Sequence, residues 1–283
     1  MASGHPRRHA PRADDLADRA VDALIAEAML TPKPALVDQR GCGAHHDLDL
    51  DCLLRSAQAL RSTFLSMALH ASVGTLGLEL REQLGAIGRH GEWRMLAATG
   101  GSNAHRGAIW VMGLLVAALA LTGTHRPTTE IAAVAARLAR LPDRHAPDVP
   151  SNGSRACRHF GVSGARGEAA GGFPHVLNFG LPTLQARRRQ GADETCARLD
   201  ALMAIMSSLD DTCLLHRGGW AAVRAAKSGA RRVLALGGSA TAAGLRALLS
   251  LDTELVRRHA SPGGCADLLA ACLFLDGVQC PEA

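Results

Sequence analysis

The sequence is poor in aromatic residues and in lysine, and it has no tyrosine. Only 3% of its 283 residues are aromatic, and Lys33 and Lys227 are the only lysines among 31 basic residues. So few aromatic side chains argue against the stacking platforms on which proteins hold single-stranded nucleic acids. The net charge of +5 forms no basic block that would follow a nucleic-acid backbone. We therefore expect a small anionic ligand and no nucleic-acid partner.

Paired cysteines and long apolar runs are also lacking. The eight cysteines include no Cys-x-x-Cys pair, which argues against a zinc ribbon and a thioredoxin-type site. The longest apolar run, residues 108–121, falls short of the roughly 20 residues that span a bilayer. The basic N-terminal segment has no apolar core and therefore does not fit a secretion signal. These features predict a cytoplasmic protein with reduced thiols and no membrane contact.

Strand signals are weak, whereas apolar residues recur at helical spacing. β-Branched residues are sparse, and Ala, Leu and Arg dominate, which favours helices. No alternation of strands and helices appears, which argues against a doubly wound nucleotide fold. The sequence thus predicts an all-α protein, with a disordered basic tail at residues 1–13 and one large helical domain over 14–283. Helices are expected at 14–29, 50–71, 77–88, 92–99, 106–121, 128–141, 193–208, 219–228, 241–258 and 264–275.

One segment, residues 142–172, interrupts this pattern with many Pro, Gly, Ser and Arg residues. It is open to two interpretations, a boundary between domains or a long functional loop.

Polar junctions rich in Gly or Pro lie between the apolar helices. Helix N-termini that follow glycine-rich turns present free backbone N–H groups, which suit phosphates. We expect these junctions to form one cleft, although they lie far apart in the sequence. They are residues 31–38, 43–49, 99–107, 164–168, 210–219 and 261–267.

These junctions resemble, motif by motif and in the same order, the triphosphoribosyl-dephospho-coenzyme A synthases. The family motifs are TPKPGLVD, GAHxDM, ATGGVNTHKGAIF, GARGEA, DTxxxxRGG and SPGGxADLLA, and the match runs from about Leu24 to Leu275. The departures are small. Ala35 replaces a glycine, Leu48 a methionine and Arg106 a lysine, and residues 102–104 read Ser-Asn-Ala instead of Val-Asn-Thr.

The resemblance implies transfer of the 5-triphosphoribosyl group of ATP to a ribose hydroxyl of 3′-dephospho-coenzyme A, with release of adenine. The product, 2′-(5″-triphosphoribosyl)-3′-dephospho-CoA, is the precursor of the prosthetic group of an acyl-carrier subunit. We expect this subunit to belong to malonate decarboxylase rather than citrate lyase. The implied partners are ATP, dephospho-CoA, and either the acyl-carrier subunit or its phosphoribosyl-dephospho-CoA transferase. Mg²⁺ is the expected cofactor, and a homodimer the expected assembly.

This chemistry needs particular side chains. Breaking an N-glycosidic bond develops positive charge on the sugar, which a carboxylate stabilises. Adenine must gain a proton and the attacking hydroxyl must lose one, while a triphosphate needs cations. The acid and the base stay unassigned among Asp, Glu and His. The predicted catalytic residues are Asp47, His105, Glu168 and Asp211. The predicted binding residues are Lys33, Asp38, His45, Asn103, Arg106, Arg166, Arg217 and Ser261, and the predicted Mg²⁺ ligands are Asp47, Asp211 and Asp267.

Structural roles compete with these assignments. Asp47 or Asp49 is expected to cap the following helix, and Asn103 is also suited to capping. Arg166 and Glu168 have an internal salt bridge as their alternative, and Asp267 a purely structural place in the first turns of a helix.

Two other functions are open. One is a Mg²⁺-dependent hydrolase of ribosyl nucleotides, and the other is a non-catalytic helical partner of the acyl-carrier subunit. The hydrolase differs in that its release of adenine would not require dephospho-CoA.

Overall fold

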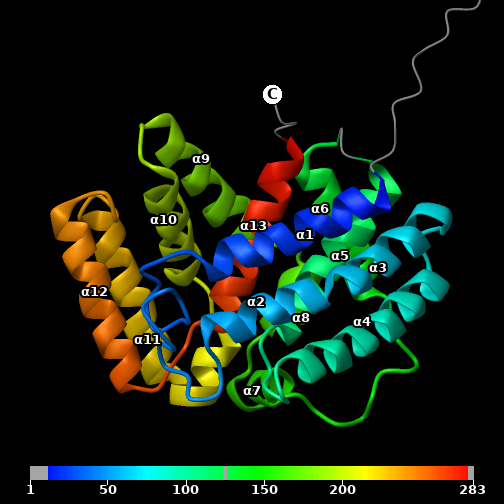
Figure 1. Ribbon diagram of the computed structural model, residues 1–283, viewed down its shortest axis with the longest axis horizontal. Coiled ribbons are helices and arrows are strands. Elements are labelled where there is room, and N and C mark those ends of the chain that lie inside the picture. Colours follow the sequence, from blue (N-terminus) through cyan, green and yellow to red (C-terminus); the bar gives the residue numbers. More distant parts are fainter. Residues whose placement is uncertain (1–11, 124–125, 280–283) are drawn as a thin grey trace, which may run out of the picture.

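The computed structural model describes residues 12–123 and 126–279, and this part of the chain is built from helices (Figure 1). It contains no strand, and its only β-type pairing is an isolated bridge between Asp38 and Gly41. The all-α prediction is confirmed. None of the described helices has both the length and the apolar character needed to cross a bilayer. The predicted basic tail lies almost wholly outside the described residues, and the first helix begins at Ala13.

Two apolar helices form the centre of the molecule. The apolar run 108–121 forms most of α5 (Arg106–Thr122), which is buried on nearly all sides because it is apolar all round. It packs against α13 (Gly263–Gln279), which also contacts α1 (Ala13–Ala28). Both α5 and α13 begin at predicted polar junctions, so the centre of the fold holds two of the junctions in place.

The N-terminal helices cover one side of this centre (Figure 1). The segment predicted as one helix over 50–71 is two helices that meet at Leu60, whereas 77–88 and 92–99 belong to a single long helix. Gly91 inside that long helix lies against the Thr63 side chain, so the glycine permits close packing of neighbouring helices. The bounds are α2 (Leu50–Ala59), α3 (Arg61–Val73), α4 (Leu78–Ala98) and α6 (Thr128–Arg140).

The segment 142–172 is not a boundary between domains. It forms two short helices that pack onto neighbouring parts of the bundle, α7 against α11 and α8 against α5 and α6. A π-helical turn and a further helix that the sequence did not predict follow it. The bounds are α7 (Asn152–Phe160), α8 (Gly164–Ala170), η1 (Val176–Gly180) and α9 (Leu181–Arg189).

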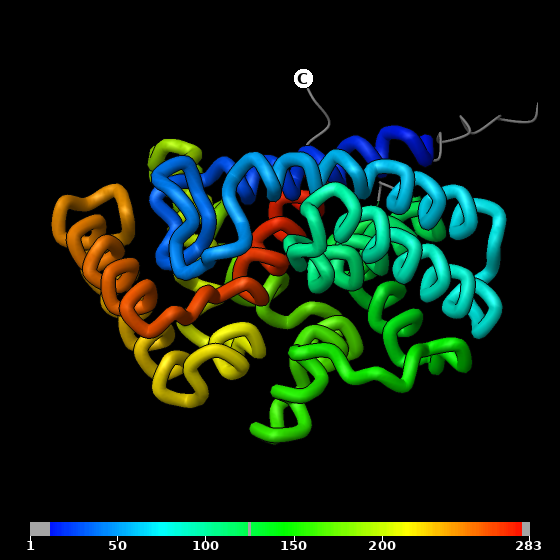
Figure 2. The backbone as a smooth tube through the Cα atoms, turned by 60° about the horizontal axis from the view of Figure 1, so that its bottom comes forward, coloured from blue at the N-terminus to red at the C-terminus, as the bar shows by residue number. Residues whose placement is uncertain are grey.

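The remaining helices extend the bundle at one end, where α11 and α12 lie side by side (Figures 1 and 2). The predicted helix 219–228 is part of a longer one that is bent at Gly219, whose φ of 59° and ψ of −162° are not helical. This left-handed φ suits glycine, because a side chain there would be strained. The bounds are α10 (Glu194–Met206), α11 (Thr212–Ala235) and α12 (Ala242–Arg257).

Candidate functional site

One cleft of about 960 Å³ is lined by residues from all the predicted junctions. The structure therefore brings together segments separated by more than two hundred residues of sequence. The predicted residues that line the cleft are Lys33, His45, Asn103, His105, Arg106, Arg166, Glu168, Asp211, Arg217, Ser261 and Asp267. Asp38 and Asp47 are the two predicted residues that do not line it.

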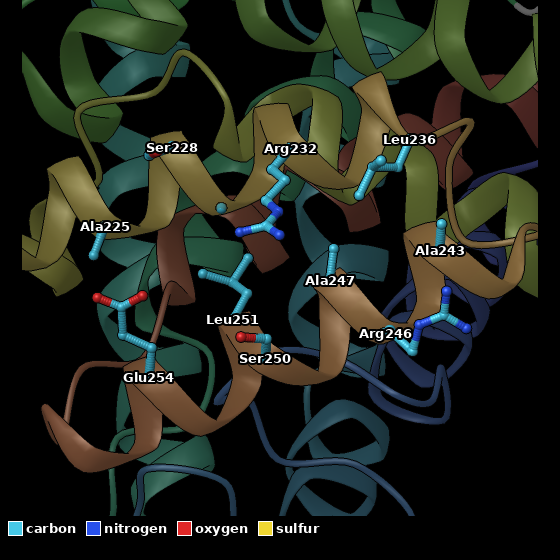
Figure 3. A pocket seen from close by; sticks show the side chains of 11 residues that line it. Ala225, Ser228, Arg232, Leu236, Ala243, Arg246, Ala247, Ser250, Leu251 and Glu254 are labelled. Atoms are coloured by element: carbon cyan, nitrogen blue, oxygen red, sulfur yellow. The ribbon is translucent and has the colours of Figure 1, made fainter.

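A separate pocket of about 470 Å³ lies between α11 and α12 (Figure 3). Arg232, Arg246 and Glu254 line it together with small and apolar side chains. None of the predicted site residues contributes to this pocket, so the site is assigned to the larger cleft.

Lys33 and Glu27 form a buried ion pair in the cleft wall. Glu27 lies in the last turn of α1, and the Lys33 ammonium donates to Glu27 Oε1 at 2.6 Å and to the Glu27 carbonyl at 2.7 Å. Only 1% of Lys33 and 5% of Glu27 is exposed. An ammonium has three donors, so these two bonds leave Lys33 one N–H for a ligand in the cleft.

Asp38 organises the loop that carries Lys33. Its carboxylate accepts hydrogen bonds from the Lys33 backbone N–H at 2.8 Å and from Arg40. Burial alone would raise the pKa of Asp38, but the Arg40 guanidinium and two backbone N–H groups hold it below its ordinary value. Asp38 was predicted to bind substrate, whereas its contacts are those of a structural residue that positions Lys33.

The same loop contains Ala35 at the position where the family motif has glycine. Ala35 is fully buried and has a φ of 56°, in the left-handed region that favours glycine. Its carbonyl accepts from the Ala44 N–H at 3.0 Å, and its N–H donates to Asp252 Oδ1 at 2.7 Å. The first bond joins the first two junctions, the second ties the loop to α12, and together they hold the alanine in a conformation that few non-glycine residues adopt.

Asp47 and Asp49 lie beside the cleft at the start of α2. Asp49 caps α2 by accepting a hydrogen bond from the Cys52 N–H at 2.7 Å, so one of the two aspartates caps this helix as expected. The Asp47 side chain is 59% exposed, and its Oδ1 lies 3.7 Å from His45 Nδ1. The structure thus places Asp47, predicted to be catalytic and metal-binding, on the surface next to the cleft.

His45 and Arg217 connect the second junction to α11. The Arg217 guanidinium donates to His45 Nδ1 at 3.2 Å. Burial, followed by the positive charge of Arg217, lowers the pKa of His45 to about 4, although Asp47 opposes the shift. The imidazole is therefore neutral at neutral pH, which leaves its Nδ1 free to accept this bond.

Asn103 and Arg106 form the exposed start of α5. Asn103 Oδ1 accepts from the N–H of Arg106, the first residue of α5, at 3.2 Å, although the N-cap position itself is His105, whose side chain makes no capping bond. The Arg106 guanidinium forms an ion pair with Glu92, with its Nε 2.9 Å from Oε2, but this Nε has no hydrogen-bond partner among the described residues. Both side chains line the cleft, and the unpartnered Nε leaves Arg106 a donor for a ligand.

His105 lies one residue before α5 and is buried in the cleft wall. Its Nδ1 is 2.7 Å from Ser56 Oγ. Burial, with a further contribution from the positive charge of Lys33, lowers the pKa of His105 to about 4. His105 is therefore a neutral hydrogen-bonding group at neutral pH.

Asp211 joins the N-termini of α11 and α13. Its Oδ1 accepts from the N–H groups of Cys213 at 2.7 Å and Leu214 at 3.4 Å, and its Oδ2 accepts from Cys265 N–H at 2.8 Å. Gly264 lies against the carboxylate, where a methyl group would come within 3.1 Å of its atoms. Burial raises the pKa of Asp211 although these N–H groups oppose the shift.

Asp267 and Ser261 are two buried polar residues at the start of α13, and the Ala108 backbone N–H is a hydrogen-bond partner of the Asp267 carboxylate. Burial raises the pKa of Asp267 well above its ordinary value, and the negative charges of Glu27 and Asp211 raise it further. Asp267 Oδ2 packs directly on Gly107, where a methyl group would overlap it. Ser261 is 1% exposed, and its Oγ has no hydrogen-bond partner among the described residues.

Arg166 and Glu168 do not pair with each other. Both oxygens of the buried Glu168 are bound by His175, Oε1 by the backbone N–H at 2.8 Å and Oε2 by Nδ1 at 2.7 Å. The exposed Arg166 forms no ion pair within the described ranges and lies over the Trp110 ring, 5.8 Å from its centroid. Of the salt bridges that could compete with substrate contact, none forms between Arg166 and Glu168, and Glu168 pairs with His175 instead.

The described part of the chain contains no preformed metal-binding cluster of side chains. No three His, Cys, Asp or Glu side chains there come together as a metal-binding group. Asp47, Asp211 and Asp267, the predicted ligands, accordingly do not form one cluster. The structure also adds residues that the sequence did not single out, above all Arg81, Trp110 and Asp143 in the cleft wall. Arg81 and Asp143 belong to none of the quoted motifs, and Trp110 stands at the last position of the ATGGVNTHKGAIF motif, where the family has phenylalanine.

Comparison with known proteins gives one consistent result. A family model described as ATP:dephospho-CoA triphosphoribosyl transferase matches residues 13–282. A protein of Azotobacter vinelandii named "Probable 2-(5''-triphosphoribosyl)-3'-dephosphocoenzyme-A synthase" is 55% identical over 269 residues, covering 94% of this chain and 92% of that protein. A Klebsiella pneumoniae protein named as the same synthase is 52% identical over 278 residues, covering 98% and 99%. No solved structure matches the chain.

Proposed function

Because the chain belongs to the ATP:dephospho-CoA triphosphoribosyl transferase family, we propose that the cleft binds ATP and 3′-dephospho-CoA together and joins them. The 2′-hydroxyl oxygen of the acceptor bonds to C1′ of the ATP ribose, and the bond from C1′ to adenine breaks. The hydroxyl proton is lost and adenine gains one, so the products are free adenine and 2′-(5″-triphosphoribosyl)-3′-dephospho-CoA. The single observation that carries this proposal is the convergence of all the family motifs on one cleft.

The carboxylates at the start of α11 and α13 suit the sugar. C1′ becomes positively charged as adenine leaves, and nearby negative charge stabilises that state. Asp211 is held by three backbone N–H groups, and Asp267 lies close enough to Asp211 for the charge of one to raise the pKa of the other. We assign these two residues to the face of the cleft that receives the ribose.

Glu168 suits the role of the base for the acceptor hydroxyl. Its carboxylate lines the cleft and is 6% exposed, and His175 fixes both of its oxygens. Each carboxylate oxygen has two lone pairs, so each keeps one for the hydroxyl proton. A base held in one orientation accelerates the reaction more than a mobile one, because its carboxylate oxygen already points at the hydroxyl proton that it removes.

Mg²⁺ fits the cleft as a companion of the triphosphate, with Asp267 as its protein ligand. The repulsion among Glu27, Asp211 and Asp267 marks a place where a cation is favoured. Mg²⁺ commonly takes only one or two protein carboxylates and fills its other positions with water and phosphate oxygens. The ion would neutralise phosphate charge, whereas Lys33 and Arg217 contribute cations of the protein itself.

We also propose that the product serves malonate decarboxylase rather than citrate lyase, supported by the length of the chain and its overall resemblance. A cytoplasmic location is proposed as well, supported by the free cysteines among the described residues.

Incubation of the protein with ATP, dephospho-CoA and Mg²⁺ tests the proposed reaction. Mass spectrometry is expected to detect dephospho-CoA enlarged by one triphosphoribosyl group, and chromatography is expected to detect free adenine. Excess chelator is expected to stop both. A protein that binds both nucleotides but leaves their masses unchanged would contradict the proposal and favour a non-catalytic role.

A further inference from the structure

The cleft has a second cationic region, away from Lys33, in which the predicted binding residue Arg166 meets Arg81, a residue outside every predicted junction. Trp110 on α5 lies at its centre. The guanidinium carbon of Arg81 on α4 is 5.1 Å from the centroid of the Trp110 ring, and that of Arg166 on α8 is 5.8 Å away. Trp110 Nε1 donates to the Ala165 carbonyl at 3.2 Å, which fixes the ring against α8. One indole thus holds two arginines from different helices beside the same cleft.

Arg81 is buried without full pairing. It is 6% exposed, and its Nε has no hydrogen-bond partner among the described residues. Its nearest carboxylate oxygen is Asp143 Oδ2, 3.6 Å from Nη1, and that oxygen accepts a shorter bond of 2.8 Å from Arg89. Buried donors are nearly always satisfied in proteins, so an unpartnered guanidinium N–H in a cleft wall points to an acceptor that a ligand supplies.

The charge balance of this region favours an anion. Asp143 is shared between Arg81 and Arg89, and Arg166 has no carboxylate partner within the described ranges. Burial lowers the pKa of Arg81, and the positive charges of Arg166 and Arg89 act in the same direction against Asp143. Gly85 lets Asp143 pack closely against α4, since a methyl group at that position would overlap Asp143 and come within 3.0 Å of Arg81. The fold therefore gathers three guanidinium groups around a single carboxylate in the cleft wall.

We propose that Arg81, Trp110 and Arg166 form a subsite that binds the oligophosphate chain of a nucleotide substrate. Guanidinium groups bind phosphate oxygens through paired N–H donors, and two arginines held at one indole match adjacent phosphates of one chain. The inference rests on the proposed function, which supplies two such chains, the triphosphate of ATP and the diphosphate of dephospho-CoA. Trp110 is a positioning residue here, because it orients the two guanidinium groups.

Inorganic tripolyphosphate is a probe of this subsite that needs no catalysis. Isothermal titration calorimetry would compare the wild-type protein with Arg166→Gln, which removes an exposed side chain, and with Arg81→Lys, which keeps the charge but removes Nε. Losing one charge-assisted bond to phosphate is expected to weaken binding about ten- to hundred-fold. Arg224→Gln is the matched control, because Arg224 is exposed on α11 and does not line the cleft.

Steady-state kinetics identify which substrate uses the subsite. A raised KM for ATP in Arg166→Gln assigns the subsite to the triphosphate, and a raised KM for dephospho-CoA assigns it to the diphosphate. The inference is overturned if the wild-type protein makes product while neither variant differs from Arg224→Gln in probe affinity or in either KM. A wild-type protein that makes no product would instead count against the proposed function, and the calorimetric comparison would still test the subsite.

Discussion

The buried pair of Lys33 and Glu27 makes a strong quantitative prediction about stability. Replacing Lys33 by Met keeps most of the apolar stem but removes the ammonium, and with it the bonds of 2.6 and 2.7 Å to Glu27. The Glu27 carboxylate then stays buried without a cation, close to the negative charge of Asp267. Breaking a buried ion pair from one side costs about 3–5 kcal/mol, a large part of the stability of a typical domain.

Denaturant unfolding followed by far-ultraviolet circular dichroism measures this loss, because the protein is helical. The matched control is Arg55→Met, which breaks a pair of the same 2.6 Å length to Asp51 whose side chains are 53% and 82% exposed. An exposed pair of this kind contributes about 1 kcal/mol or less. The double variant Lys33→Met, Glu27→Gln also removes the stranded charge and is expected to recover part of the loss. If Lys33→Met costs no more than Arg55→Met, the description of a buried, mutually dependent pair is refuted.

Three further predictions concern pH, a close contact and a shared cap. The pKa of His105 is about 4 in the folded protein and about 6.5 unfolded, so the unfolded state binds its proton first as the pH falls. The folded protein therefore loses about 3 kcal/mol of its free energy of unfolding as the pH falls from 6.5 to 4. The variant His105→Asn should flatten this part of a plot of unfolding free energy against pH. The control His90→Asn, which replaces an exposed histidine, should not. The variant Gly107→Ala should displace the Asp267 carboxylate and sharply lower turnover. The free energy of unfolding should change by only about 1 kcal/mol, because alanine favours the helix. Unchanged turnover would contradict the contact between Gly107 and Asp267. The variant Asp211→Asn should lower the free energy of unfolding by about 1–3 kcal/mol and should also lower activity. The reason is that an amide has one acceptor oxygen, whereas Asp211 accepts from N–H groups on both α11 and α13. An unfolding midpoint equal to that of the wild type would refute this bridging role.

The helices that could be predicted from the sequence are those with strong apolar patterns. The apolar run at 108–121 predicts a helix over 106–121, and α5 ends only one residue later, at Thr122. A helix that is apolar on all sides is expected in the core. The helix α7 was missed because only Ala156 in it is buried, so it has no apolar stripe to recognise. The early start of α11 was missed because Asp211, its cap, looked like a loop carboxylate in the sequence.

The candidate site also has features that the sequence predicts and features that it does not. Its junctions could be predicted because glycines beside charges are uncommon in a chain that needs only to form helices, and they do meet in one cleft. The exact role of each aspartate could not, since Asp38 and Asp49 in structural turns resemble Asp267 facing the cleft until their partners are known. Arg81 carries no sequence signal, and its place beside Trp110, the last residue of a family motif, could not be predicted because only the tertiary packing of α4 on α5 brings the two together.

The dependence of adenine release on the acceptor tests the central claim most directly. Free adenine would be measured over time with ATP and Mg²⁺, in the presence and absence of dephospho-CoA. A cleft that joins two nucleotides in one transfer predicts one adenine released for each dephospho-CoA consumed, and negligible release without the acceptor. Adenine release at the same rate without dephospho-CoA would contradict the transfer, because water would then be the acceptor and the protein a hydrolase.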